Sequence, residues 1–146
     1  MRISTKGRYG TRFMLELGLN YKSDMPRPVN IHEISVRQGI SKKYLEQIIP
    51  PLAKGGLIRS IRGAKGGYVL AQNPENITIG QILELLEGSL APVDCIGCAE
   101  GSHCLKSEAC VTASVWQKIY DAVKEVVDHI SLEDLITDYS QLNPEC

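Results

Sequence analysis

The chain has 146 residues with a net charge of −1, and 43% of its residues are hydrophobic and 23% charged. This composition excludes a disordered or fibrous chain, and no apolar run approaches the ~18 residues of a membrane span. The N-terminus scatters basic residues where a signal peptide needs an apolar core. We therefore expect a cytoplasmic protein without a membrane partner.

The small net charge hides a strong asymmetry. Residues 1–70 hold 13 Lys and Arg against 4 Asp and Glu, whereas residues 71–146 hold 3 against 13. A basic half suits a polyanion, because Lys and Arg near phosphates release condensed counterions. The alternative is a solvated basic surface without a ligand.

The basic half contains the pattern of a helix-turn-helix. Apolar residues at helical spacing predict a first helix between Ser4 and Asn20. Asn30 is expected to cap a second helix that runs to about Gln38, and Gly39 can turn the chain before Ser41 caps a third. We expect Pro50 and Pro51 to interrupt and kink the third helix, because proline lacks an N–H.

A β-hairpin is predicted directly after the third helix. Two short β-branched stretches, 57–61 and 68–70, flank the glycine-rich basic turn RGAKGG. A hairpin that follows a helix-turn-helix is typical of a winged helix, in which the hairpin is the wing. The third helix would present its first turns to the major groove. The DNA-contacting candidates are therefore Ser41, Lys42, Lys43, Tyr44, Glu46 and Gln47 on this helix, and Arg62 and Lys65 on the wing.

Each of these candidates also has a simpler interpretation. Gln47 can pair with adenine and Glu46 can accept from cytosine, whereas the lysines suit phosphates. All of them could instead form a solvated helix face, and the ring of Tyr44 could pack on the wing.

The acidic half ends in two predicted helices. Thr78 can cap a short helix that Gly88 ends, and Ser131 begins a final short helix. Between them, apolar residues recur every three or four positions from Val115 to Ile130, which predicts a long amphipathic helix. A second copy of the chain is the preferred partner for its apolar face, and packing within one chain is the alternative.

Four of the five cysteines lie between Asp94 and Cys110. Cys95, Cys98, Cys104 and Cys110 follow the spacing C-x2-C-x5-C-x5-C. Thiolates suit iron–sulfur clusters or zinc, and structural zinc sites usually show two close pairs, so the single pair favours iron. An inert cysteine loop and a structural zinc site remain alternatives.

Several stretches resemble the Rrf-type winged-helix regulators, a family that includes the iron–sulfur assembly repressor IscR, the cysteine-metabolism repressor CymR and the nitric-oxide sensor NsrR. They are MRISTKGRYG, GISKKYLEQ, and SIRGAKGGYVL followed by ITIGQILELLEG. The resemblance implies a homodimer on a palindromic operator in double-stranded DNA. It places Ser41, Tyr44, Glu46, Gln47 and Arg62 at DNA-reading positions.

The resemblance also implies cluster ligands, from which this chain departs. IscR-like proteins use three cysteines, matched by Cys98, Cys104 and Cys110, and a histidine where this chain has Ala113. NsrR-like proteins use an acidic residue near position 8, where this chain has Arg8. Cys95 can supply the fourth thiolate or replace Cys98. The remaining candidates for the open position are His103, Glu100 and Glu108.

The predicted fold is mainly α with a small β-wing: a winged helix-turn-helix head, residues 1–75, and residues 76–146 with a cluster-binding loop, 94–111, and dimerisation helices. The predicted function is a repressor that senses iron–sulfur status through a cluster, with [2Fe–2S] favoured and [4Fe–4S] possible. A CymR-like repressor controlled by an enzyme partner is the alternative. We expect neither catalysis nor a small-molecule substrate, because the chain lacks a phosphate loop and a paired nucleophile and base.

Overall fold

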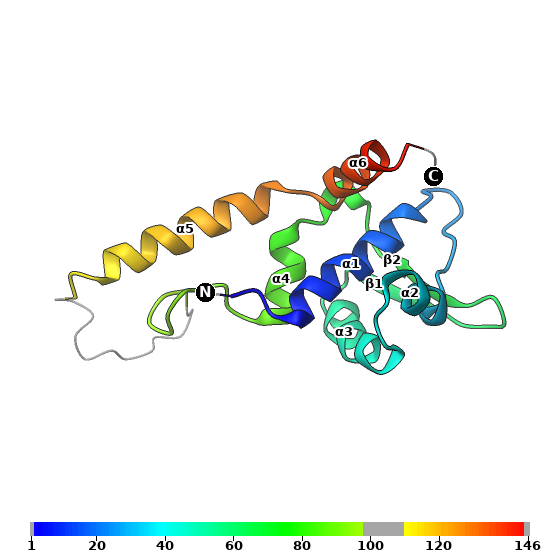
Figure 1. The fold of residues 1–146 in the computed structure, drawn as a ribbon, viewed down its shortest axis with the longest axis horizontal. Coiled ribbons are helices and arrows are strands. Elements are labelled where there is room, and N and C mark those ends of the chain that lie inside the picture. The colour runs from blue at the N-terminus through cyan, green and yellow to red at the C-terminus, as the bar shows by residue number, and fades with distance from the viewer. Residues whose placement is uncertain (1, 98–109, 145–146) are drawn as a thin grey trace.

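The computed structural model describes residues 2–97 and 110–144. Most helices form a head, from which one long helix extends as an arm (Figure 1). The elements in chain order are α1 (Thr5–Leu19), α2 (Ile31–Gln38), α3 (Lys42–Lys54), β1 (Ile58–Ile61), β2 (Gly67–Leu70), the 3-10 helix η1 (Pro74–Asn76), α4 (Ile79–Glu87), α5 (Ala113–His129) and α6 (Leu132–Leu142). The predicted fold class, mainly α with a small wing, is confirmed.

The helix-turn-helix forms from local capping signals. Asn30 caps α2 by accepting a hydrogen bond from the backbone N–H of His32 at 2.8 Å. Gly39 ends α2 with φ +63°, a left-handed conformation that glycine adopts without steric cost. Two residues later, Ser41 Oγ accepts from the backbone N–H of Tyr44 at 3.2 Å and so caps α3. The two helices are therefore joined by a tight turn, as the sequence predicts.

The paired prolines do not interrupt α3. The helix is continuous over 13 residues, with Pro50 and Pro51 inside it. A proline in a helix removes one backbone hydrogen bond, and tertiary packing can offset that loss. Here the apolar face of α3 is buried on both sides of the prolines, by Ile48 before them and Leu52 after them. The expected interruption is wrong, and a kink at this point stays a prediction.

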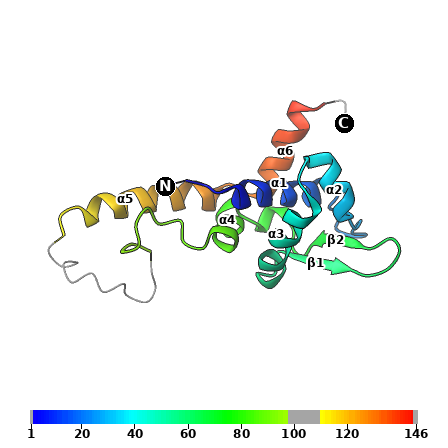
Figure 2. The same ribbon diagram turned by 60° about the horizontal axis from the view of Figure 1, so that its bottom comes forward.

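The wing is a two-stranded antiparallel hairpin. Ile58 pairs with Leu70 and Ile61 pairs with Gly67. Gly67 lies against the backbone of Val29, where a Cβ would meet the carbonyl carbon at 2.6 Å. Since backbone atoms cannot yield as a flexible side chain can, this position requires glycine. The hairpin projects from the head at the end opposite to α5 (Figure 2).

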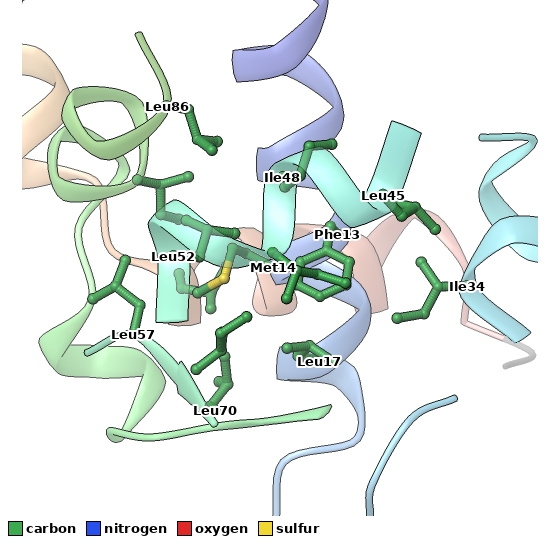
Figure 3. Packing of buried hydrophobic residues seen from close by; sticks show 14 of the residues in the cluster. Phe13, Met14, Leu17, Ile34, Leu45, Ile48, Leu52, Leu57, Leu70 and Leu86 are labelled. Atoms are coloured by element: carbon green, nitrogen blue, oxygen red, sulfur yellow. The ribbon is translucent and has the colours of Figure 1, made fainter. Parts of the chain in front are cut away.

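A single hydrophobic core holds the head together. Figure 3 shows Phe13 and Met14 of α1 packed with side chains from α3 and the hairpin. The most deeply buried members are Phe13, Met14, Leu17, Val29, Ile34, Leu45, Ile48, Leu52, Ile77, Ile82 and Leu132. Burial of this apolar area, worth about 25 cal/mol per Å², is the main force that fixes the angles between the helices.

Helices α4 and α6 also pack against α1. Close approach is possible because α1 carries glycines at the crossings: Gly10 lies against Leu86 of α4, and Gly18 against Ile136 of α6. Leu132, at the start of α6, is fully buried in the same core as Phe13. The division of the chain at residue 75 stays a prediction, since both parts contribute to this core.

Helix α5 differs from the others because none of its 17 residues is buried within the described part of the chain. It contacts the head mainly through α4, where Lys124 of α5 forms an ion pair with Glu84. Within α5, Lys124 also pairs with Asp128 at 3.0 Å. These contacts raise the pKa of Lys124, chiefly through the hydrogen bond with Glu84. Neither α5 nor any other helix in the described ranges has the length and apolar character needed to cross a bilayer.

Candidate functional site

The first two turns of α3 present a polar surface to solvent. Five of the six candidates on this helix are exposed, and Tyr44 is half-buried; the exposed ones are Ser41, Lys42, Lys43, Glu46 and Gln47. Leu45 and Ile48 point into the core and thereby set which side of the helix faces outward. The N-terminal side chains of α3 are therefore open to solvent at the end of the helix from which a recognition helix contacts bases.

The wing presents the other two basic candidates. Arg62 and Lys65 are exposed in the turn between β1 and β2. Gly63 adopts φ +119° there, and Gly66 donates its backbone N–H to the Gly63 carbonyl at 3.0 Å. Within this turn only Gly63 needs a positive φ, whereas Gly66 is required by its close approach to the carbonyl of Ile61. The turn thus exposes two cations within the short segment between the strands.

Tyr44 packs on α1 rather than on the wing. Its ring lies edge-to-face against the ring of Tyr9, with centroids 5.4 Å apart and planes at 79°. The tyrosine of the wing, Tyr68, instead packs against Phe13 at 6.3 Å. The alternative that Tyr44 covers the wing is therefore wrong. The Tyr44 ring thus packs the first turn of α3 against α1.

Sequence reasoning missed the residues of α1 that support this surface. Neither Tyr9 nor Arg12 is among the site residues that the sequence predicts. The Arg12 guanidinium lies 5.6 Å from the Tyr9 ring centroid and donates two hydrogen bonds to Gln38, the last residue of α2. The basic character of Arg12 is visible in the sequence, but its partner lies 26 residues away.

The structure describes two of the four predicted thiol ligands. Cys95 is exposed and Cys110 is partly exposed, and both are free thiols. The other two, Cys98 and Cys104, lie outside the described residues, as do the alternative ligands Glu100, His103 and Glu108. The residues just before Cys98 pack against the arm: a Cβ on Gly97 would meet Cζ of Tyr120 on α5 at 3.1 Å.

The surroundings of Cys110 favour its thiolate form. The Thr112 hydroxyl lies 3.2 Å from the sulfur, and this hydrogen bond, together with a weaker contribution from the backbone of Ala113, lowers the pKa of the thiol below its ordinary value of 9.0. Metal ions bind the thiolate rather than the thiol. The Cys110 environment therefore fits a soft-metal ligand.

The two positions at which this chain departs from the known ligand sets have ordinary structural roles. Ala113 is the first residue of α5. Arg8 lies on the first turns of α1, where its guanidinium donates to Thr5 Oγ1 at 3.1 Å. Neither side chain can bind a metal as the histidine or carboxylate would.

The exposed valines of α5 lie along one line. Val115 and Val126 are 49% and 58% exposed, and Ile119 and Ala122 fall between them at intervals of four and three residues. Lys124 and Asp128, which face α4, lie on another side of the helix. The head therefore holds one side of the arm and leaves an apolar line uncovered.

Comparison with known proteins assigns the family. The Rrf2 model, described as an iron-dependent transcriptional regulator, matches residues 3–138. The HTH-type transcriptional regulator CymR of Bacillus subtilis is 44% identical over 92% of this chain and 89% of its own length. The HTH-type transcriptional regulator IscR of Pectobacterium atrosepticum is 35% identical over 98% of this chain and 84% of its own length.

Solved structures agree with this assignment. CymR of B. subtilis, described as a global cysteine regulator, superposes with a TM-score of 0.74 at 40% identity, covering 94% of this chain and 97% of that one. IscR from T. potens superposes with a TM-score of 0.77 at 39% identity, covering 97% and 90%. These relatives are regulators, not enzymes. The chain, with its winged-helix head, belongs to the Rrf2 family of transcriptional regulators.

Proposed function

We propose that this protein is a cytoplasmic repressor that reads a palindromic DNA operator as a homodimer. The observation that carries the proposal is the exposed, capped start of α3, which offers Lys42, Lys43 and Gln47 on one surface. Gln47 and Glu46 would contact base edges, while the lysines would hold phosphates. Arg62 and Lys65 on the wing would contact the DNA beside this helix.

The arm supports the dimer. An exposed apolar line along a helix of 17 residues is costly in water, and a two-fold related copy of the same helix would cover it. Two heads joined in this way would meet two half-sites about one helical turn of DNA apart. An operator with two-fold symmetry follows from that arrangement.

We further propose that the cysteine segment holds an iron–sulfur cluster, with [2Fe–2S] favoured over [4Fe–4S]. The ligands would be Cys95, Cys98, Cys104 and Cys110, an all-thiolate set that needs neither of the fourth ligands known from IscR-like and NsrR-like proteins. The lowered pKa of Cys110 supports this donor set. A bound cluster would supply a group that responds to iron supply and to oxidants.

The position of the segment supports a role in regulation. The residues that lead to Cys95 run from the end of α4, and Leu90 and Ile96 are buried among the described residues. Gly97 lies against Tyr120 of the arm. A change in how this segment is ordered can therefore alter the packing between head and arm, and operator affinity must then differ between the two states.

The test starts with anaerobic purification and analysis of iron, acid-labile sulfide and zinc. Iron and sulfide in matching amounts support the cluster, and operator affinity is then compared between the loaded protein, the iron-free protein and a Cys104→Ala variant. Equal affinity in all three would reject regulation by the cluster while leaving DNA binding intact. Zinc without sulfide would instead support a structural metal site.

A second candidate is a CymR-like repressor of cysteine metabolism controlled by an enzyme partner. The identity of 44% with CymR over most of both chains favours it. The four cysteines within 94–110 instead favour the iron–sulfur hypothesis. A purified protein that is free of iron and binds its operator at full affinity, and whose affinity changes only when a metabolic enzyme is added, would decide for this candidate.

A further inference from the structure

Arg12 links α1 to the end of α2. Its Nε donates to Gln38 Oε1 at 2.8 Å, and its Nη2 donates to the Gln38 backbone carbonyl at 2.7 Å. That carbonyl belongs to the last turn of α2, where carbonyl groups have no partner within the helix. A cation at this end also interacts favourably with the helix dipole. The two bonds therefore hold the point at which the chain leaves α2 for the turn.

Glu16, one turn after Arg12 on α1, contacts the same last turn of α2. Glu16 is only 5% exposed, and its carboxylate accepts from Gln38 Nε2 and, at 3.4 Å, from Arg37 Nη1. Both ends of the Gln38 amide are thus bound by α1, the oxygen by Arg12 and the nitrogen by Glu16. This fixes the orientation of Gln38 relative to α1.

Arg12 also supports the start of α3 through an aromatic pair. Its guanidinium lies over the Tyr9 ring at 5.6 Å from the centroid, and Tyr9 lies edge-to-face against Tyr44. Cation–π and edge-to-face contacts are each directional, so they restrain the rings as well as bury them. One side chain therefore contacts the end of α2 directly and the start of α3 through one intermediate.

We propose that Arg12 is a positioning residue that adjusts the angle between the two helices of the helix-turn-helix, within the arrangement that the apolar core sets, and thereby the specificity with which α3 reads DNA. The inference rests on the proposed reading of the operator by α3. Ile34 and Leu45 pack the two helices against the common core, and Gly39 adds no side chain at their junction. The contacts from α1 further restrain the point at which the chain leaves α2.

The alternative role for Arg12 is a direct contact with a DNA phosphate, because it is exposed and basic. The two roles differ in what they require. A phosphate contact needs a positive charge, which lysine retains. The positioning role needs the planar fork of arginine, which donates two bonds to Gln38 while stacking on Tyr9, and lysine cannot do both.

The experiment measures binding by the full-length protein to a short duplex selected by the wild type from a randomised pool, and to a scrambled duplex of the same composition, over a range of salt concentrations. The variants are Arg12→Lys and Arg12→Met. The matched controls are Arg8→Lys and Arg8→Met, one turn earlier on α1, where the guanidinium contacts Thr5. Circular dichroism and thermal unfolding check that each variant is folded.

We expect Arg12→Lys to weaken binding to the selected duplex by about tenfold, a change of about 1.4 kcal/mol, while binding to the scrambled duplex stays the same. Arg12→Met should also weaken binding to the selected duplex alone, without changing the salt slope. Gln38→Leu should likewise lower the ratio of affinities for the selected and the scrambled duplex. If Arg12→Lys binds like the wild type, or if Arg12→Met reduces the salt slope by about one, the positioning role is overturned. The lysine variant keeps the test valid should the methionine variant fail to fold.

Two further variants separate this inference from the proposed function. Gln47→Ala and Arg62→Ala remove residues that the proposal places on the DNA. If both bind the selected duplex like the wild type, the reading by α3 and the wing is wrong and the role of Arg12 falls with it. If they lose affinity while the Arg12 variants do not, only the positioning role is rejected.

Discussion

The carboxylate of Glu87, at the end of α4, caps the first turn of α1 through Ser4. Glu87 Oε1 accepts from the Ser4 backbone N–H at 2.9 Å and from the Ser4 hydroxyl at 2.7 Å, and it also accepts from the backbone N–H of Gly7 at 3.1 Å. The first N–H groups of a helix have no partner within the helix, and a negative charge is favourable there. Glu87 therefore ties the helix that precedes the cysteine segment to the helix that supports α3.

Replacement of Glu87 should destabilise the head. Glu87→Ala removes all three hydrogen bonds and should cost ~1–2 kcal/mol of unfolding free energy, whereas Glu87→Gln keeps an acceptor oxygen and should cost only ~0.5 kcal/mol. Urea unfolding at one fixed protein concentration measures both. The exposed Glu75 on η1 provides the control substitution Glu75→Ala. Equal losses for the two Glu87 variants would show that charge, and not hydrogen bonding, is responsible.

The contact between the wing and the backbone at Val29 should not tolerate a side chain at position 67. A Cβ there would meet backbone atoms of Val29 and Asn30, the latter at 3.0 Å. We expect Gly67→Ala to cost ~1–3 kcal/mol, the usual range for overpacking, and to weaken DNA binding by displacing the hairpin. Thermal unfolding and binding to a selected duplex measure the two effects. Ala64→Ser, in the exposed turn of the same hairpin, should change neither.

Base reading and phosphate binding should separate between α3 and the wing. Gln47→Ala should relax preference at one base pair, at a cost of ~1–3 kcal/mol for the preferred base, because the amide would no longer pair with the base edge. Binding to a set of duplexes that vary one position at a time measures this. Lys65→Ala is the contrasting variant: it should weaken all sequences alike and reduce the salt slope by about one. A uniform loss for Gln47→Ala would place that residue on the backbone instead.

A charge on the uncovered line of α5 should prevent dimer formation. Val126 is 58% exposed in the single chain, and a carboxylate in its place would be buried against the second copy without a partner. We expect Val126→Asp to shift the protein to a monomer in sedimentation velocity. Gln117→Asp adds the same charge on another side of the helix and should leave the dimer intact. A monomeric wild type would refute this use of the arm.

The reactivity of Cys110 should depend on Thr112. The hydroxyl lowers the pKa of the thiol, so the thiolate forms at a lower pH than the ordinary value of 9.0 would allow. Thr112→Val removes this hydrogen bond, and the pKa should rise toward 9.0. The alkylation of Cys110 in the metal-free protein, followed by peptide mass spectrometry, should then need a higher pH to reach the same rate. Ser114→Ala is the control, because Ser114 donates to the Val111 carbonyl instead.

Local sequence signals predicted the elements of the head well. The capping residues Ser4, Ser41, Thr78 and Ser131 each begin a helix where the sequence places one. Gly39 and Gly88 end helices with positive φ, as expected of glycine. These signals act between residues that are neighbours in the chain, and they hold whatever the rest of the fold does. The prediction that Pro50 interrupts α3 is wrong, because burial of the apolar face of α3 outweighs the low helix preference of proline.

The supporting contacts of the candidate site followed a different rule. Arg12 and Gln38 are 26 residues apart, and Ser4 and Glu87 are 83 apart. No periodicity or motif in the sequence predicts such pairs, because they depend on how the helices cross. The same holds for α6: its sequence predicts a helix, but its packing against α1 through Ile136 and Gly18 is known only from the fold.

The sequence by itself determined the helix-turn-helix, the wing, the basic residues and the amphipathic character of α5, because each depends on local chemistry or on a regular spacing. Only the tertiary structure decided that Tyr44 rests on Tyr9, that Arg12 holds the end of α2, and that Glu87 caps α1. Those contacts form once the core has brought distant segments together, and burial of apolar side chains, not the polar pairs themselves, sets that arrangement.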